Sequence, residues 1–194
     1  GWSTEPFRMA ALSALGWSAF FEGAFRTLQA EECFPARVAI QLRGHYLLYA
    51  EDGEWRGEVT GKIHYTAKGM GDFPVVGDWV VVKKSGTERT GVISAILPRR
   101  TEFARKAAGF RTGKQVLTAN IDLVFVVSSC DADFNLKRID RYLVVARSSG
   151  AEPVVVLNKA DLAENGEQLV GEVRRDAPGV RVLLTSAKTS LGLD

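Results

Sequence analysis

Between residues 36 and 98, apolar and polar residues alternate with a period of two, the spacing of strands that bury one face. Turn residues such as Asp52-Gly53 and Ser85-Gly86 separate the alternating runs. The runs predict strands at Arg37–Leu42, Tyr46–Tyr49, Trp55–Val59, Trp79–Lys83 and Gly91–Leu97. Five short strands in about 65 residues are typical of a small barrel such as the OB-fold, which often binds nucleic acid.

From residue 119 onward, apolar runs alternate with segments of helical period. The runs Ile121–Ser128, Pro153–Leu157 and Val180–Thr185 are typical of strands that are covered on both faces. Between them, Leu136–Ser149 and Gly166–Arg175 predict helices, so the order indicates a parallel sheet. Nucleotide-binding sheets usually have more strands. We therefore expect this half-sheet to keep an unpaired edge and an uncovered face unless more chain follows.

The sequence thus predicts an α+β protein with two domains. Helical periodicity over residues 10–29 predicts one or two short helices that pack on the barrel. The expected parts are an N-terminal helical segment at 1–35, an OB-fold five-stranded β-barrel at 36–98, a basic linker at 99–118, and a partial α/β parallel sheet at 119–194.

The composition is that of an ordinary globular protein, with 25% charged and 46% apolar residues. No apolar run approaches the roughly 20 residues of a membrane span, and no secretory signal is evident. Cys33 and Cys130 lie far apart without metal-type spacing and are predicted to be free thiols. His45 and His64 are remote from any cysteine cluster, so we expect no metal site in this chain. The expected location is the cytoplasm, as a monomer without a membrane partner.

The net charge is only +2, but the cations are concentrated. Residues 83–114 hold nine Lys and Arg against two Asp and Glu, with Phe103 and Phe110 interleaved. The candidates for contact with RNA phosphates are Lys83, Lys84, Arg99, Arg100, Arg105, Lys106, Arg111 and Lys114. The alternative is a solvated linker whose charge has no partner.

The motif Asn158-Lys159-Ala160-Asp161 directly follows a predicted buried strand. Guanine presents two adjacent donors, N1-H and N2-H, and an ionised carboxylate accepts both. Adenine lacks this pair, so a site built around Asp161 would reject it. The methylene stem of Lys159 would lie over the base, and the Asn158 amide would tie this loop to its neighbours.

A second motif, Thr185-Ser186-Ala187-Lys188, follows the next predicted strand. We expect the backbone N–H of Ala187 to donate to guanine O6, Ser186 to shape the turn, and Lys188 to cover the other face of the base. Either motif alone occurs by chance in unrelated chains. Their shared position at the carboxyl ends of buried strands, where open α/β sheets bind ligands, favours a guanine site.

A phosphate-binding loop is missing from the sequence. Such a loop is rich in glycine and ends in Gly-Lys-Ser or Gly-Lys-Thr between a strand and a helix. The segments Gly57–Ile63 and Gly109–Gln115 have the wrong spacing and no hydroxyl. The one Asp-x-x-Gly, at Asp176–Gly179, follows a charged helix end and indicates a helix stop. We therefore assign no catalytic residue to this chain.

A series of short motifs resembles the circularly permuted bacterial GTPases of the RsgA (YjeQ) family over roughly residues 36–194. The motifs are Val76-Gly77-Asp78-Trp79, Pro98-Arg99-Arg100-Thr101, Phe103–Ala107, Ala119–Asp122, Asp133–Asn135, Arg141–Leu143 and Asn158–Asp161. In this family the guanine-reading loops precede the phosphate-binding loop, which accounts for the order of motifs seen here.

The resemblance implies an OB-fold that contacts ribosomal RNA, a P-loop GTPase-like domain that binds GTP and GDP with Mg²⁺, and a C-terminal zinc-binding domain. It also implies GTP hydrolysis during late maturation of the small ribosomal subunit. The present chain would be an N-terminal fragment, inactive by itself. One alternative is a stand-alone RNA-binding barrel with a relic half-domain. Another is a barrel that binds oligosaccharide or protein through Trp55, Tyr65 and Trp79.

Overall fold

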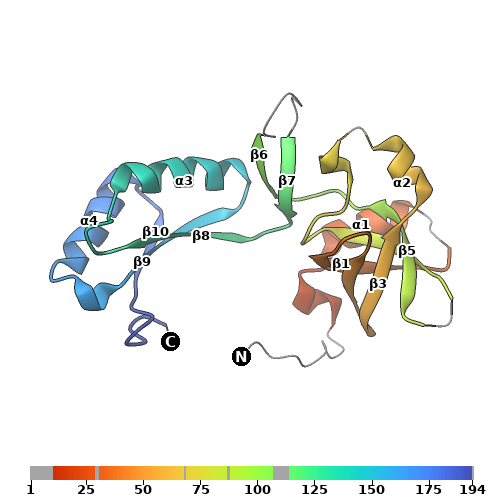
Figure 1. Ribbon diagram of the computed structural model, residues 1–194, viewed down its shortest axis with the longest axis horizontal. Helices are drawn as coiled ribbons and strands as arrows, with labels where there is room; N and C mark the ends of the chain where they lie inside the picture. Colours follow the sequence, from red (N-terminus) through yellow and green to blue (C-terminus); the bar gives the residue numbers. More distant parts are fainter. Residues whose placement is uncertain (1–10, 29–30, 68, 87, 107–113, 194) are drawn as a thin grey trace. The chain divides into compact units, whose positions relative to one another are not determined.

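The computed structural model describes residues 11–28, 31–67, 69–86, 88–106 and 114–193 (Figure 1). The chain forms two compact units, residues 1–120 and 121–194. The helices of the first unit are η1 (Leu12–Leu15), α1 (Ala19–Thr27), α2 (Gly61–Thr66) and η2 (Met70–Asp72). Its strands are β1 (Cys33–Gln41), β2 (Tyr46–Ala50), β3 (Gly53–Val59), β4 (Trp79–Lys84), β5 (Thr90–Ile96), β6 (Glu102–Lys106) and β7 (Lys114–Ala119).

Strands β1 to β5 close into a barrel in the order β1-β2-β3-β5-β4, which confirms the predicted five-stranded barrel. Alternate residues of β4 belong to two different apolar clusters. On β4, Val80 and Val82 pack with Leu48 and Ile93 in one cluster. The alternate residue Trp79 belongs to the other cluster, which includes the N-terminal helices. β4 therefore buries both of its faces over Trp79–Val82, and this part of its sequence is continuously apolar.

The N-terminal helices cover this second side of the barrel wall. Phe21 of α1 is buried, and its ring lies 5.9 Å from that of Trp79, centroid to centroid. Trp17 meets Trp79 edge to face at 4.7 Å. These contacts confirm the prediction of short helices that pack on the barrel. The six-residue α2 was not predicted, because one and a half turns show no helical period.

The segment predicted to be a basic linker contains β6 and β7, which pair antiparallel. Ala104 packs in a small cluster with Val75, Val116 and Ala119. The linker interpretation is wrong for residues 102–106 and 114–118, because small alanines carry a weak apolar signal between cations. Residues 107–113 lie outside the described part of the chain.

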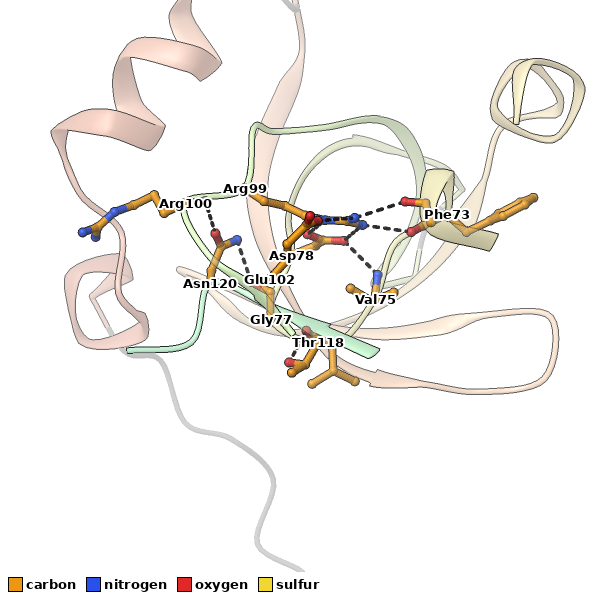
Figure 2. A network of polar contacts seen from close by, with 11 residues as sticks. Phe73, Val75, Gly77, Asp78, Arg99, Arg100, Glu102, Thr118 and Asn120 are labelled. Atoms are coloured by element: carbon orange, nitrogen blue, oxygen red, sulfur yellow. Dashed lines mark hydrogen bonds and ion pairs between the residues drawn. The ribbon is translucent and has the colours of Figure 1, made fainter. Parts of the chain in front are cut away.

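A buried ion pair joins the barrel to the chain that leaves it (Figure 2). The carboxylate of Asp78 is fully buried and accepts two hydrogen bonds from the guanidinium of Arg99, both at 2.8 Å. Arg99 also donates to the carbonyls of Gly71 and Phe73, and Asp78 accepts from the backbone N–H of Val75. Each group is therefore satisfied inside the fold, as a buried charge requires.

Asn120, the last residue of the first unit, completes this network. Its side chain accepts from the backbone N–H of Arg100 and donates to the carbonyl of Gly77 (Figure 2). Its own carbonyl accepts from Arg37. Gly77 has a φ of +90°, and a Cβ there would lie 2.0 Å from the carbonyl oxygen of Ala119. Only glycine permits this close approach of the two backbones.

The second unit is a three-stranded parallel sheet with two helices, as predicted. Its elements are β8 (Leu123–Ser129), α3 (Leu136–Ser148), β9 (Glu152–Asn158), η3 (Ala160–Leu162), α4 (Gly166–Asp176) and β10 (Arg181–Leu184). The strand order is β10-β9-β8, so the chain winds in one direction. Right-handed crossovers wound in one direction place both helices on the same face.

One face of this sheet is packed against the helices, and the other leaves part of its apolar surface exposed, although Val154 of the central strand is buried there. Val126, Val155 and Val182 form a cluster with the apolar faces of α3 and α4. On the opposite face, Phe125 is 60% exposed and Val127 is 61% exposed. Among the described strands, none pairs with the outer edge of β8. The expected open face and free edge are thus present.

We predict that Arg99→Ala lowers the free energy of unfolding of the first unit by about 3–5 kcal/mol, because it leaves the buried Asp78 carboxylate unpaired. Chemical denaturation followed by tryptophan fluorescence measures this, since all four tryptophans precede residue 120. The matched control is Arg100→Ala, an exposed neighbour whose loss should cost less than about 0.5 kcal/mol. Equal losses in the two variants would contradict the role given to the ion pair.

Candidate guanine-binding site

The candidate site lies at the carboxyl edge of the parallel sheet. The register places Ser129 at the end of β8 opposite Asn158 at the end of β9, and Leu157 opposite Leu184 of β10. Because the strands are parallel, the loops that come after them emerge at the same edge. The two sequence motifs, separated by more than twenty residues in the chain, are therefore neighbours.

Backbone hydrogen bonds fasten the three loops to one another. The N–H of Cys130 donates to the carbonyl of Asn158 at 2.9 Å. The N–H of Ala160 donates to the carbonyl of Thr185 at 3.0 Å, and that of Thr185 donates to the carbonyl of Leu157 at 2.8 Å. The positions of the motif side chains are thus set by the ends of the sheet.

Asp161 is oriented by Ser186 across the gap between two loops. The Ser186 hydroxyl is buried and donates to Oδ1 of Asp161 at 2.6 Å. Asp161 as a whole is exposed, but its side chain keeps only 15% of its accessible surface. Lys188, which is 80% exposed, brings its Nζ to 4.0 Å from Oδ2. The carboxylate is fixed in direction and retains lone pairs for two further donors.

The Asn158 side chain connects the two motifs, as expected, but with a partner that was not predicted. Its Oδ1 accepts a hydrogen bond from the N–H of Ala187 at 3.0 Å and lies 3.4 Å from the Thr185 hydroxyl. The N–H predicted to be reserved for guanine O6 is therefore engaged within the protein. The adjacent strand ends bring Asn158 directly beside Ala187, and donation of this N–H to guanine O6 stays a prediction.

Lys159 is held by a residue that the motifs do not contain. Its Nζ lies 2.7 Å from Oδ2 of Asp131, in the loop after β8. Oδ1 of Asp131 accepts from the Ser129 hydroxyl at 2.6 Å and from the N–H of Asp133 at 3.0 Å. The hydrogen bond from Lys159, together with the weaker effect of that from Ser129, holds the pKa of Asp131 well below its usual range. The same bond raises the pKa of Lys159.

A hollow of about 360 Å³ adjoins these side chains. Asn158 and Lys159 line it together with Arg138 of α3 and Ser128 of β8. The Ser128 hydroxyl is buried, and in the described part of the chain it has no hydrogen-bond partner. A buried hydroxyl without a partner is costly, so the hollow is a place where an additional polar group would be stabilised.

The predicted RNA-contacting residues fall into three groups. Lys84 and Arg100 are exposed, and Lys83 is exposed but lies 3.5 Å from Glu32. Arg99 is only 15% exposed and is committed to Asp78, so its assignment to RNA is wrong. Arg111 and the side chains of Arg105, Lys106 and Lys114 lie outside the described parts of the chain.

The described residues contain no group of three or more His, Cys, Asp and Glu side chains that could hold a metal ion. Cys33 and Cys130 are free, as predicted, and burial raises the pKa of the Cys130 thiol. None of the helices in the described ranges is both long and apolar enough to cross a bilayer.

Sequence reasoning did not find Asp131, Ser129 or Ser128. A usable signal was present, since all three lie at or just past the end of a predicted buried strand. These polar residues belong to neither of the two guanine motifs. Only the register between β8 and β9 reveals that Asp131 faces Lys159.

A family profile and several curated proteins match the sequence of this chain. The profile of the family described as RsgA GTPase matches residues 96–194. A protein of Opitutus terrae named small ribosomal subunit biogenesis GTPase RsgA is 43% identical over 190 residues, which cover 94% of this chain and 52% of that protein. A protein of the same name from Streptomyces coelicolor is 38% identical over 188 residues, covering 95% of this chain and 50% of that protein.

Two solved structures resemble this fold. YjeQ from Thermotoga maritima matches with a TM-score of 0.67 and 24% identity, over 83% of this chain and 54% of that one. YloQ, described as a circularly permuted GTPase, matches with a TM-score of 0.60 and 24% identity, over 81% of this chain and 53% of that one. The present chain spans about half the length of the curated relatives it matches.

Proposed function

The chain belongs to the RsgA GTPase family, and from this premise we propose that it is the guanine-reading part of a GTPase that acts in biogenesis of the small ribosomal subunit. The names of its relatives support this proposal. So does the site, in which Asp161 and Ser186, from two different motifs, are joined by a 2.6 Å hydrogen bond. That hydrogen bond is the observation that carries the proposal.

The geometry suits a guanine base for a specific chemical reason. The Asp161 carboxylate is nearly enclosed, so an incoming base must replace the water that hydrates it. Guanine offers two donors to its two oxygens, whereas adenine offers a lone pair. Ser186 fixes the carboxylate in advance, which lowers the ordering cost of binding. Guanine O6 would share the N–H of Ala187 with Asn158 or displace the amide.

We propose that GTP hydrolysis requires parts of the parent protein beyond these 194 residues. The sequence contains no Gly-Lys-Ser or Gly-Lys-Thr loop for the phosphates. The open sheet face at Phe125 and Val127 and the free edge of β8 are suited to additional strands and helices. Such strands would approach the hollow beside Ser128. The Mg²⁺ ligands and the zinc-binding domain of the family would belong to those parts, and this chain alone would be inactive.

The barrel and the segment that follows it are proposed to contact ribosomal RNA in the cytoplasm, through exposed cations that include Lys84 of β4 and Arg100. An RNA-binding barrel that acts without nucleotide is the second candidate. RNA binding by the barrel alone does not require Ser186 to orient Asp161, and we therefore favour the GTPase.

We predict that Asp161→Asn in the full-length protein weakens GTP binding by roughly two to four orders of magnitude, because the neutral amide keeps one acceptor for guanine N1–H but turns an N–H donor toward the guanine amino group. Xanthosine triphosphate should gain affinity, since the new amide donates where xanthine has a carbonyl at C2. Steady-state hydrolysis with both nucleotides measures the switch.

The control is Glu164→Gln, which removes the same charge from an exposed side chain three residues away. It should leave the preference for guanine unchanged. Retention of normal GTP activity by Asp161→Asn would refute the assignment of Asp161.

For the segment that follows the barrel, we predict that replacing Arg100, Arg105 and Lys106 by Ala weakens binding to the small subunit. The slope of the logarithm of the binding constant against the logarithm of the salt concentration should also become shallower. The change should be about one unit for each phosphate that the variant no longer neutralises. The charge-matched control replaces Arg147, Arg174 and Arg175 on α3 and α4. Filter binding over a range of salt concentrations compares them. Equal weakening by both sets would indicate a response to net charge and not an RNA interface.

A further inference from the structure

We propose that Asp131 is a positioning residue for guanine recognition, acting through Lys159. This inference rests on the proposed function and adds a member to the site that neither guanine motif contains. The observation is the 2.7 Å distance between Oδ2 of Asp131 and Nζ of Lys159, across the ends of β8 and β9.

The Asp131 carboxylate is held in place independently of Lys159. Its Oδ1 accepts from the hydroxyl of Ser129, the last residue of β8, and from the backbone N–H of Asp133 in the loop that follows. This arrangement aims Oδ2 toward the neighbouring strand end. The acceptor is therefore fixed before the lysine reaches it.

Lys159 needs such an acceptor because its side chain has many conformations. Its backbone lies in the left-handed region, with a φ of +65°, directly after β9. The four-carbon stem carries substantial rotamer entropy, and its side chain is 49% exposed. The bond to Asp131 anchors the ammonium, so the stem lies along the edge of the sheet where the base would bind. Ordering the stem before the ligand arrives reduces the cost of binding.

A hydrogen bond that merely stabilised the loop would predict a different pattern of mutational effects. If Asp131 acts through the ammonium of Lys159, its removal should matter only while that ammonium is present. Lys159→Met keeps an apolar stem of similar length and removes the charge. The two substitutions should then be non-additive, as expected for residues that touch each other.

The test is an NMR titration of the 194-residue chain with GDP for wild type, Asp131→Ala, Lys159→Met and the double variant. Asp131→Ala should raise the dissociation constant by about two- to tenfold, the effect of releasing one ordered long side chain. In the Lys159→Met background, Asp131→Ala should have no further effect. Asp133→Asn removes a nearby charge that acts on Lys159 only through space, and it should change the affinity less than Asp131→Ala.

The outcomes separate this inference from the function on which it rests. Unchanged affinity in Asp131→Ala, while Asp161→Ala still weakens GDP binding, would overturn the inference alone. An additive effect in the double variant would also overturn it, because Asp131 would then act independently of the ammonium. Absence of GDP binding by the wild-type chain would overturn both the inference and the proposed function.

Discussion

The parallel pairing of β8, β9 and β10 is the constraint on which the site depends. It brings the ends of three strands to one edge, where backbone hydrogen bonds between Cys130 and Asn158 and between Ala160 and Thr185 lock the loops together. Within that frame Ser186 reaches Asp161. Chain order does not matter to this geometry, because adjacency is set by the sheet. The guanine motifs can therefore form their site at this edge of the sheet even where they precede the phosphate-binding loop in the chain.

Among the described residues, this sheet has an unpaired edge at β8 and a partly exposed face, as expected for one part of a larger GTPase domain. Both helices lie on one face because all crossovers wind in one direction. The other face exposes Phe125 and Val127, and the hydroxyl of Ser128 is buried without a partner among the described residues. Additional strands paired to the free edge of β8 would lie near the Ser128 hydroxyl, and the helices that connect them would cover Phe125 and Val127. Base recognition and phosphate chemistry would thus reside in two halves that meet at β8.

Periodicity predicted most of the fold, because burial of alternate residues in the barrel and of continuous runs in the sheet leaves a clear pattern. It failed where the signal was chemically ambiguous. The charge of Arg99 looks the same in the sequence whether it faces RNA or the buried Asp78. The hairpin of β6 and β7 was obscured because Ala104 and Ala119 are weakly apolar. The pairing of Asp131 with Lys159 depends on strand register, which the sequence does not specify directly.

The most direct test of the account is whether this isolated chain distinguishes guanine from adenine at the edge of its sheet. A ¹H–¹⁵N NMR titration with GDP, and separately with ADP, maps the amides that respond. The account predicts that GDP at millimolar concentration shifts the amides of Asn158, Lys159 and Ser186–Lys188, while ADP leaves them in place. Equal shifts with both nucleotides, or shifts confined to the barrel, would contradict it.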